Sequence, residues 1–301
     1  MPLENLIAAT YTPLQQDLSI NLTAVQTYGA FLKRNRVSGA FVNGTTADFV
    51  SLSTEERKLI VEAWSKEKTK DFQLINHVGH NNLREAIALT EHCADKVDAI
   101  AALAPFYFKL NSLEQLLEYC KQIAFAAPKL PFYYYHIPVL TGADFKMIDF
   151  LMAATQEIPN FSGIKFSKND LIDFTHCLNF NKGATNILFG VDEIFLSSLP
   201  LGAKGWVGST YNHLAPLYYK IKDSFENKNH VQAGELQQKA IRFVELLDQY
   251  GGYNGAAKGL MKILGVDCGP SRFPHSTLKE DHYPRLIEAL ENEDIFQYTS
   301  R

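Results

Sequence analysis

Hydrophobic and polar residues alternate along the chain on two different periods. Short stretches rich in β-branched and aromatic residues predict eight strands, at residues 6–12, 39–44, 73–78, 99–106, 131–137, 161–166, 186–191 and 205–208. Between them, apolar residues recur at helical spacing around residues 21–35, 53–68, 81–94, 112–126, 144–155, 169–179, 192–201 and 212–225. This alternation predicts parallel strands joined by crossover helices. Eight units favour an α/β fold of the closed (β/α)₈ or TIM-barrel type, although an open doubly wound sheet has the same pattern.

Local signals mark where two of these helices begin. Ser53 and Glu56 have the spacing of a capping box, in which each side chain bonds the backbone N–H of the other residue. Ser112 precedes Glu114 and a pair of leucines, which is another helix start.

Helical spacing continues after the eighth unit, without further strands. It predicts about three more helices, at residues 229–250, 253–265 and 275–291. We therefore expect residues 1–225 to form the barrel that carries the active site. Residues 226–301 are expected to form a helical extension packed on that barrel.

The composition narrows the class of protein. Of the 301 residues, 46% are hydrophobic and 21% are charged, which is typical of a globular protein with a substantial core. The formal net charge is −4 and no long basic run is present, so nothing predicts nucleic acid or an anionic membrane as a partner. No apolar run reaches the roughly 20 residues that a membrane span needs.

Cysteine usage and the first residues bear on the compartment. The four cysteines, Cys93, Cys120, Cys177 and Cys268, form no CxxC pair. We expect free, buried thiols in a reducing compartment. The first residues lack the basic and apolar segments of a signal peptide, which predicts a cytoplasmic location.

A lysine in the sixth predicted strand is the first candidate for chemistry. In this fold, active side chains lie at the carboxyl ends of the strands and in the loops that follow. Lys165 is flanked by Ile164 and Phe166. Burial disfavours a charged lysine, and the neutral amine is a nucleophile towards ketones. The alternative is a lysine whose ammonium group reaches solvent at the barrel mouth.

The fifth predicted strand contains three consecutive tyrosines followed by a histidine. Because side chains alternate between the two faces of a strand, Tyr133 and Tyr135 share one face and Tyr134 lies on the other. A phenol near the top of the barrel could relay a proton. Alternatively, all three rings pack in the core and their hydroxyls bond the backbone. We interpret His136 as a hydrogen-bonded packing histidine.

Two turns are rich in hydroxyl groups. Thr45 and Thr46 follow the second predicted strand, and hydroxyls with free N–H groups in a glycine-containing turn suit a carboxylate. The alternative is ordinary Ser/Thr turn chemistry. Ser209 lies in a similar turn after the eighth predicted strand.

The seventh predicted strand ends beside two carboxylates, Asp192 and Glu193, which follow Gly190. Such a pair could bind a metal, act as acid and base, or hold sugar hydroxyls. Alternatively, it caps the next helix, where acidic groups are favourable. His77 and His80 form an HxxH pair, but no third ligand lies nearby in sequence, so we do not expect a metal site.

Together these motifs resemble the N-acetylneuraminate lyase subgroup of the dihydrodipicolinate synthase superfamily. The resemblance covers about residues 6–264 and rests on GTT after the second predicted strand, PFY after the fourth, YYYHIP and GIKFS in the fifth and sixth, FGVDE after the seventh and GSTYN after the eighth. GTT and the lysine are shared across the superfamily, whereas YYYHIPxLTG, GVDE and GSTYN are more specific to the lyases.

The resemblance implies roles for individual residues. Lys165 matches the lysine that forms the Schiff base, and Tyr135 matches the tyrosine that relays protons. Thr45 and Thr46 match the pair that binds the pyruvate carboxylate, and Thr46 is also counted with the catalytic residues because this pair links the proton relay. Tyr107 matches a tyrosine that is contributed to the site of a neighbouring subunit.

Further positions match residues that bind the substrate. Gly190, Asp192, Glu193 and Ser209 match those that hold the hydroxyl tail of sialic acid. Ser167 matches one near the reacting hydroxyl, and Tyr253 falls near an aromatic pocket position. The resemblance also implies a homotetramer and a covalent imine that needs neither a metal nor an organic cofactor.

The implied activity is the reversible cleavage of N-acetylneuraminate to pyruvate and N-acetylmannosamine. One alternative is another pyruvate-dependent aldolase of the superfamily, either dihydrodipicolinate synthase or a 2-keto-3-deoxy sugar acid aldolase. The synthase usually has an arginine where this chain has the apolar stretch 138–140. A second alternative is a non-catalytic sugar-acid binding protein. Only Ala47 and Asp48, which replace the usual Gly-Glu, favour that alternative, because alanine restricts the backbone more than glycine does.

Overall fold

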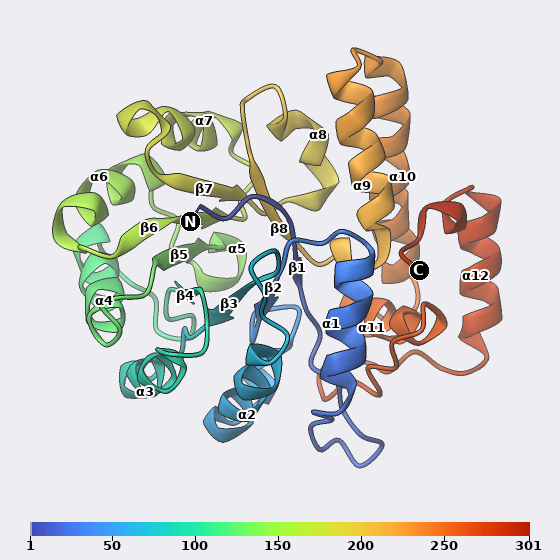
Figure 1. Ribbon diagram of the computed structural model, residues 1–301, viewed down its shortest axis with the longest axis horizontal. Helices are drawn as coiled ribbons and strands as arrows, with labels where there is room; N and C mark the ends of the chain where they lie inside the picture. The colour runs from blue at the N-terminus through green and yellow to red at the C-terminus, as the bar shows by residue number, and fades with distance from the viewer. Residues whose placement is uncertain (1) are drawn as a thin grey trace.

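Residues 2–301, the part of the chain that the computed structural model describes, form a closed barrel of eight parallel strands (Figure 1). Each strand pairs with its neighbours in sequence, and β8 pairs with β1. The strands are β1 (Asn5–Ala9), β2 (Gly39–Val42), β3 (Gln73–His77), β4 (Ala99–Leu103), β5 (Phe132–His136), β6 (Phe161–Phe166), β7 (Asn186–Phe189) and β8 (Gly205–Gly208). Closure confirms the (β/α)₈ prediction over the open sheet.

The connecting helices surround this barrel (Figure 1). The longer ones are α1 (Ala24–Arg34), α2 (Thr54–Ser65), α3 (Leu83–Cys93), α4 (Leu113–Phe125), α6 (Met147–Glu157), α7 (Leu171–Asn179) and α9 (Tyr211–Glu226). The short ones are η1 (Phe49–Ser51), α5 (Pro138–Thr141), η2 (Phe180–Gly183), η3 (Asp192–Ile194) and α8 (Phe195–Ser198). The sequence did not predict α5, because four residues are too few to show a helical period. The helix predicted at 192–201 is divided into η3 and α8.

The predicted helix starts follow the expected chemistry. Ser53 Oγ accepts a hydrogen bond from the Glu56 N–H at 3.1 Å, and Glu56 accepts one from the Ser53 N–H at 2.9 Å, which confirms the capping box. Ser112 Oγ accepts a hydrogen bond from the Gln115 N–H at 3.3 Å at the start of α4.

Two of the predicted strands extend three residues beyond the carboxyl ends of the observed ones, β1 and β4. Residues 10–12 and 104–106 continue the apolar runs of β1 and β4, but they lie in loops. Pro105 has no N–H to donate to a neighbouring strand, which favours the end of pairing there. Tyr11 is nevertheless fully buried, because the loop it belongs to is covered by other parts of the chain. Burial without strand pairing explains why the apolar run was misinterpreted.

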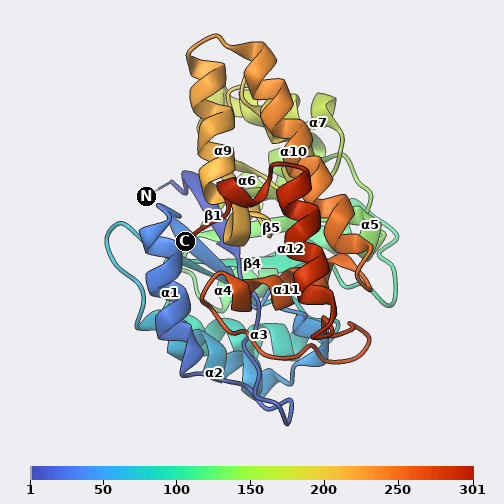
Figure 2. The ribbon, with the colours of Figure 1, turned by 90° about the vertical axis from the view of Figure 1, so that its right-hand side faces the viewer.

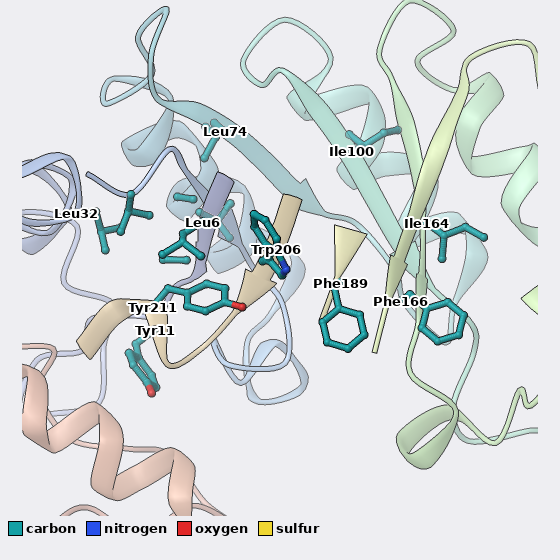
Figure 3. Close-up of a cluster of buried hydrophobic side chains, with 14 of the residues drawn as sticks. Leu6, Tyr11, Leu32, Leu74, Ile100, Ile164, Phe166, Phe189, Trp206 and Tyr211 are labelled. Atoms are coloured by element: carbon teal, nitrogen blue, oxygen red, sulfur yellow. The ribbon is translucent and has the colours of Figure 1, made fainter. Parts of the chain in front are cut away.

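Alternation along the strands separates two cores. One face of each strand points into the barrel, where a cluster that includes Phe41, Tyr133, Tyr135 and Leu188 fills the interior. The other face packs against the helices in a larger cluster, part of which is shown in Figure 3 with Ile164 and Phe166 on β6 and Trp206 on β8. Burying such side chains stabilises the fold by about 25 cal/mol per Å² of apolar surface.

Three helices follow the barrel: α10 (His230–Asp248), α11 (Tyr253–Ile263) and α12 (His282–Asn292), with a short η4 (Phe296–Tyr298) near the end. They lie on one side of the barrel, where α10 runs alongside α9 and also contacts η3, α8, α11 and α12 (Figures 1 and 2). The helices of residues 2–301 include none that is both long and apolar enough to cross a membrane.

Candidate active site

A cavity of about 240 Å³ opens at the carboxyl ends of the strands. Apart from Tyr107, every residue that the sequence analysis assigned to the site lines this cavity: Thr45, Thr46, Tyr135, Lys165, Ser167, Gly190, Asp192, Glu193, Ser209 and Tyr253. These residues come from five strand ends or loops and from α11. Closure of the barrel therefore brings together groups that are up to about two hundred residues apart in the chain.

Lys165 lies inside the barrel beside Tyr135. The two residues are direct partners in the β5–β6 register. Lys165 is only 5% exposed, and its Nζ lies 3.5 Å from the centre of the Tyr135 ring and 4.8 Å from that of Phe41. This position contradicts the alternative in which the amine extends out of the barrel into solvent.

The three tyrosines of β5 have different environments. Tyr135 Oη lies 3.3 Å from Thr45 Oγ1, so that the phenol meets the turn after β2. Tyr133, also on the inner face, donates its hydroxyl to Asn186 Oδ1 at 3.0 Å and does not line this cavity. Tyr134 points outward, where burial raises its pKa well above the usual range. Of the three tyrosines, only Tyr135 lines the cavity together with Lys165.

His136, on the outer face of β5, is fully buried as predicted for a packing residue. The expectation that its ring is hydrogen-bonded was wrong, because neither nitrogen has a partner within residues 2–301. The ring lies among aromatic side chains, including Phe166 at a centroid distance of 5.2 Å. Burial lowers its pKa to about 3 and keeps the imidazole neutral.

The turn that carries Thr45 and Thr46 is closed by its own backbone. The Asp48 N–H donates to the Thr45 carbonyl at 2.9 Å, and Asp48 has a left-handed conformation, with φ of 53°. Aspartate tolerates this region better than most residues do. Ala47 does not have a positive φ, and its carbonyl accepts a hydrogen bond from Thr12 Oγ1 at 2.9 Å. The turn therefore forms with alanine in place of the usual glycine.

Asp192 is buried between the ends of β7 and β8. Its Oδ2 accepts hydrogen bonds from the Thr210 N–H at 3.0 Å and from the Thr210 hydroxyl at 2.7 Å, whereas its Oδ1 has no partner within residues 2–301. Burial raises the pKa of this carboxyl, and the bonds from Thr210 oppose that rise. Thr210 immediately precedes α9, so the carboxylate serves the start of α9 and not that of its own helix.

Glu193 lines the same cavity and is partly exposed. Burial and the neighbouring Asp192 carboxylate both raise its pKa. Two adjacent carboxylates thus have distinct environments: one is fixed by Thr210, and the other is available to a ligand. The sequence alone does not distinguish the two carboxylates.

Two serine hydroxyls complete the wall of the cavity. Ser167 Oγ is buried and has no hydrogen-bond partner within the described chain. A Cβ atom at Gly190 would lie 2.2 Å from this oxygen, so only glycine fits beside it. Ser209 Oγ lies 3.1 Å from Tyr253 Oη, which connects the turn after β8 to the first residue of α11.

Tyr107 lies outside the cavity. Its side chain is 75% exposed and packs edge-on against Phe108, with ring centres 5.0 Å apart. Its backbone is anchored, because the N–H donates to Asn81 Oδ1 at 3.1 Å. A single chain therefore does not bring Tyr107 to Lys165.

Sequence analysis assigned no role to several residues of the site. Gly208 allows the approach of Asp192, since a Cβ there would lie 1.8 Å from Asp192 Oδ1. Thr210 fixes that carboxylate, and its position as the hydroxyl residue before a helix could have indicated a polar contact. Ile137 and Val244 contribute apolar side chains to the wall of the cavity. Nothing in the local sequence of α10 indicates that Val244 reaches the cavity.

The two histidines of the HxxH pair form hydrogen bonds outside the cavity. His77 lies inside the barrel, with its Nδ1 2.8 Å from the Asn43 carbonyl oxygen. His80 Nδ1 accepts a hydrogen bond from the Asn82 N–H at 2.9 Å. Within residues 2–301, no three His, Cys, Asp or Glu side chains are grouped as a metal site would require.

The fold and this site define a class of protein. A (β/α)₈ barrel with a buried lysine beside a tyrosine hydroxyl, facing a hydroxyl-rich turn, has the architecture of a lysine-dependent, class I aldolase.

The chain belongs to the dihydrodipicolinate synthetase family, whose model matches residues 2–293. N-acetylneuraminate lyase of Rattus norvegicus is 40% identical over 277 residues, which cover 90% of this chain and 87% of that protein. The Homo sapiens lyase is 38% identical over 302 residues, covering 99% and 94%. The solved structure of Proteus mirabilis N-acetylneuraminate lyase superposes with a TM-score of 0.94 at 34% identity, covering 98% of this chain and 100% of that one.

Proposed function

We propose that the protein reversibly cleaves N-acetylneuraminate to pyruvate and N-acetylmannosamine through a Schiff base on Lys165. The observation that carries this proposal is the position of the Lys165 amine, buried against the Tyr135 ring at the base of a polar cavity. The names of the similar proteins support the choice of sugar acid.

The first half of the proposed reaction forms the imine. The neutral Lys165 amine attacks the ketone carbon of the open-chain sugar acid and water leaves to give an imine, which takes up one proton from solvent to become the protonated imine. Thr45 and Thr46 hold the adjacent carboxylate with hydroxyl and backbone N–H groups. These neutral donors bind the anion without placing a second cation beside the lysine.

The second half breaks the carbon–carbon bond. As the aldehyde forms, the hydroxyl proton of the reacting carbon passes to the substrate carboxylate, either directly or through Tyr135, which accepts this proton and gives up its own hydroxyl proton. The electron pair of the broken bond moves into the imine and leaves an enamine. Protonation of the enamine carbon and hydrolysis of the imine release pyruvate and restore Lys165. The imine is itself the electron sink, so we propose that no metal or organic cofactor takes part.

The remaining polar groups suit the sugar tail. Glu193, Ser167 and Ser209 face the cavity, and a carboxylate forms charge-assisted hydrogen bonds with hydroxyl groups. Asp192 also lines the cavity, and its Oδ1 has no hydrogen-bond partner within residues 2–301. We propose that these groups select a long polyhydroxylated substrate. The apolar stretch after Tyr135, now seen as the start of α5, offers no cation for the second carboxylate of a dihydrodipicolinate-type substrate.

We also propose a homotetramer in the reducing cytoplasm. Tyr107 and Phe108 are highly exposed aromatic residues beside the barrel mouth, which suits a contact with a second copy of the chain. The four cysteines are free and buried, as suits a reducing compartment.

Trapping with borohydride tests the proposed function. Incubation with pyruvate and borohydride should add one reduced pyruvyl group at Lys165, and Lys165→Ala should abolish the addition. Lys258 is the matched control: it is also buried, burial lowers its pKa to about 8, and its Nζ donates to the Pro270 carbonyl outside the cavity. Lys258→Met should keep the adduct. A label on a peptide without Lys165, or no label at all, would overturn the proposal and favour a non-catalytic binding protein.

A further inference from the structure

A buried polar cluster lies beneath the turn that carries Thr45 and Thr46. It consists of Asn43, Arg57, Asn76 and His77, each of which is 0% exposed. None of these residues lines the cavity, and the proposed mechanism uses none of them. Burying four such polar side chains is costly unless each is hydrogen-bonded, so their arrangement calls for a structural or functional reason.

His77 connects three separate segments through its two ring nitrogens. Nδ1 lies 2.8 Å from the Asn43 carbonyl oxygen, and a carbonyl oxygen can only accept, so Nδ1 carries the proton. The Leu103 N–H donates to Nε2 at 3.4 Å, so Nε2 is the acceptor. The contacts therefore fix one neutral tautomer and join the end of β2, β3 and the end of β4.

The ring of His77 also supports the site by packing. Its centre lies 4.7 Å from the Phe49 ring at the far end of the turn, with the planes at 68°, and 5.9 Å from the Tyr135 ring, with the planes at 89°. One side chain thus contacts the turn at its beginning and its end. It also contacts the tyrosine whose hydroxyl meets Thr45.

Neighbouring residues hold His77 and Asn43 in this arrangement. A Cβ atom at Gly79 would lie 2.7 Å from His77 Nε2, so glycine at this position leaves room for the ring. Arg57 donates to the His77 carbonyl at 2.7 Å and to the Gly79 carbonyl at 3.1 Å. Asn43 Nδ2 donates to the Arg57 carbonyl at 3.0 Å and to Asn76 Oδ1 at 2.9 Å.

The backbone of Asn43 has an uncommon conformation, which these contacts hold in place. Its φ is 57°, a left-handed conformation that non-glycine residues rarely adopt. Its carbonyl belongs to the peptide that leads into Gly44 and Thr45. A fixed carbonyl therefore fixes the direction in which the following N–H groups and hydroxyls point.

We propose that His77 is a positioning residue for the carboxylate-binding turn. Its Nδ1–H donates a hydrogen bond to the Asn43 carbonyl and fixes the orientation of that peptide. The turn that follows then presents Thr45 and Thr46 to the substrate carboxylate. The Lys165 amine then meets a correctly placed ketone. This role rests on the proposed function. It places His77 away from the reacting atoms, so substitution of His77 should raise the pyruvate concentration needed for half-saturation and should not prevent imine formation.

A matched pair of variants isolates the hydrogen bond. His77→Leu and His77→Asn have side chains of nearly equal size, but only asparagine offers an N–H donor near the position of Nδ1. The measurement is the pyruvate concentration that gives half-maximal borohydride-trapped adduct, together with the melting temperature of each variant. His136→Leu is the control, because His136 is equally buried, on the outer face of β5, and its ring nitrogens have no hydrogen-bond partner within residues 2–301.

We expect His77→Leu to raise the half-saturating pyruvate concentration about tenfold, the effect of losing one buried hydrogen bond. His77→Asn should restore most of the loss, and His136→Leu should match the wild type. A purely structural role would lower the melting temperature of His77→Leu without changing its half-saturating concentration. If His77→Leu does not fold, His77→Phe replaces it in the experiment, because phenylalanine keeps an aromatic ring at this position and removes the N–H donor.

The outcomes separate this inference from the proposed function. A wild-type adduct at Lys165 with an unchanged half-saturating concentration in His77→Leu overturns the positioning role and leaves the proposed function intact. Equal losses in His77→Leu and His77→Asn also overturn it, because the donor would then not matter. Absence of an adduct in the wild type overturns both.

Discussion

At the scale of single residues, the environment of each polar group decides what it can do. Tyr133 and Tyr135 lie two positions apart on one face of β5, yet one bonds Asn186 and the other meets Thr45 beside Lys165. Asp192 and Glu193 are adjacent, yet Thr210 occupies an oxygen of only the first. Residue type alone therefore does not assign a role, and substitutions can separate these pairs.

Tyr135→Phe removes one oxygen and keeps the ring against Lys165. We expect a trapped pyruvate adduct close to that of the wild type, whereas cleavage of N-acetylneuraminate should fall about 10²–10⁴-fold, as loss of a positioned proton relay does. A coupled assay of pyruvate release measures turnover. Tyr133→Phe, which removes a hydroxyl outside the cavity, should stay near wild type. Normal turnover in Tyr135→Phe would show that the phenol has only a packing role.

Glu193→Ala should affect the use of the sugar acid and not imine formation. Removing one acceptor leaves substrate hydroxyls unpaired and should cost on the order of 1–3 kcal/mol in kcat/KM for N-acetylneuraminate. The pyruvate adduct should stay near normal, and activity should survive a chelator. Loss of the adduct in Glu193→Ala, or loss of activity with chelator, would show that the carboxylate takes part in bond breaking or holds a metal.

At the scale of elements, the start of α2 is tied to the segment after α11. Glu56 accepts a hydrogen bond from the Ser53 N–H and two from the guanidinium of Arg272. Arg272 also donates to the Leu18 and Ser51 carbonyls. One carboxylate thus completes a helix cap and connects the extension to the loops around the barrel mouth.

Glu56→Gln should destabilise the protein at neutral pH by about 1 kcal/mol, the usual size of a capping contribution. The hydrogen bonds from Arg272, and then that from Ser53, lower the pKa of Glu56 in the folded state. The stability it contributes is therefore present above the unfolded pKa and is lost as the pH falls through the lower folded pKa.

Urea denaturation at pH 7 and at several acid pH values checks this prediction. The difference in unfolding free energy between wild type and Glu56→Gln should shrink as the pH falls. Glu55→Gln is the control, since Glu55 lies next in the same helical turn, is 77% exposed and, within residues 2–301, forms an ion pair only with Lys58. A difference that does not depend on pH would mean that the charge of Glu56 is not what stabilises the cap.

At the scale of the whole molecule, the site combines the barrel with the helices that follow it. Val244 of α10 and Tyr253 of α11 line the cavity, and Tyr253 bonds Ser209 at the end of β8. Tyr107 faces outward, and we propose that it reaches the site of a neighbouring copy. The complete site would then need both the extension and the oligomer.

Subunit mixing tests the role of Tyr107. Lys165→Ala and Tyr107→Ala chains should each have low activity alone. After mixed assembly, a pair with one chain of each kind contains one complete site if Tyr107 acts across the interface. Random pairing across a two-fold interface should then restore about a quarter of wild-type activity. No recovery in assemblies shown by sedimentation to be mixed would place Tyr107 in its own chain's site or outside any site.

The sequence by itself determined the elements and most of the chemistry. Apolar residues recur with the period of a strand or a helix because one face of that element is buried. This recurrence can be read from a short stretch of sequence. That pattern placed Tyr133 and Tyr135 on one face of the fifth predicted strand and Lys165 in the sixth. The pattern did not predict helix α5, which is too short to show a period, and it predicted a strand at Tyr11, which is buried in a loop.

Only the tertiary structure decided which polar atoms are already satisfied. The packing of one element against another brings Thr210 to Asp192, Val244 to the cavity and His77 to the Asn43 carbonyl. The two hydrogen bonds join residues that are 18 and 34 positions apart, and no periodicity records them. A hydrogen bond depends on distances of a few tenths of an ångström, whereas a sequence pattern specifies only a face.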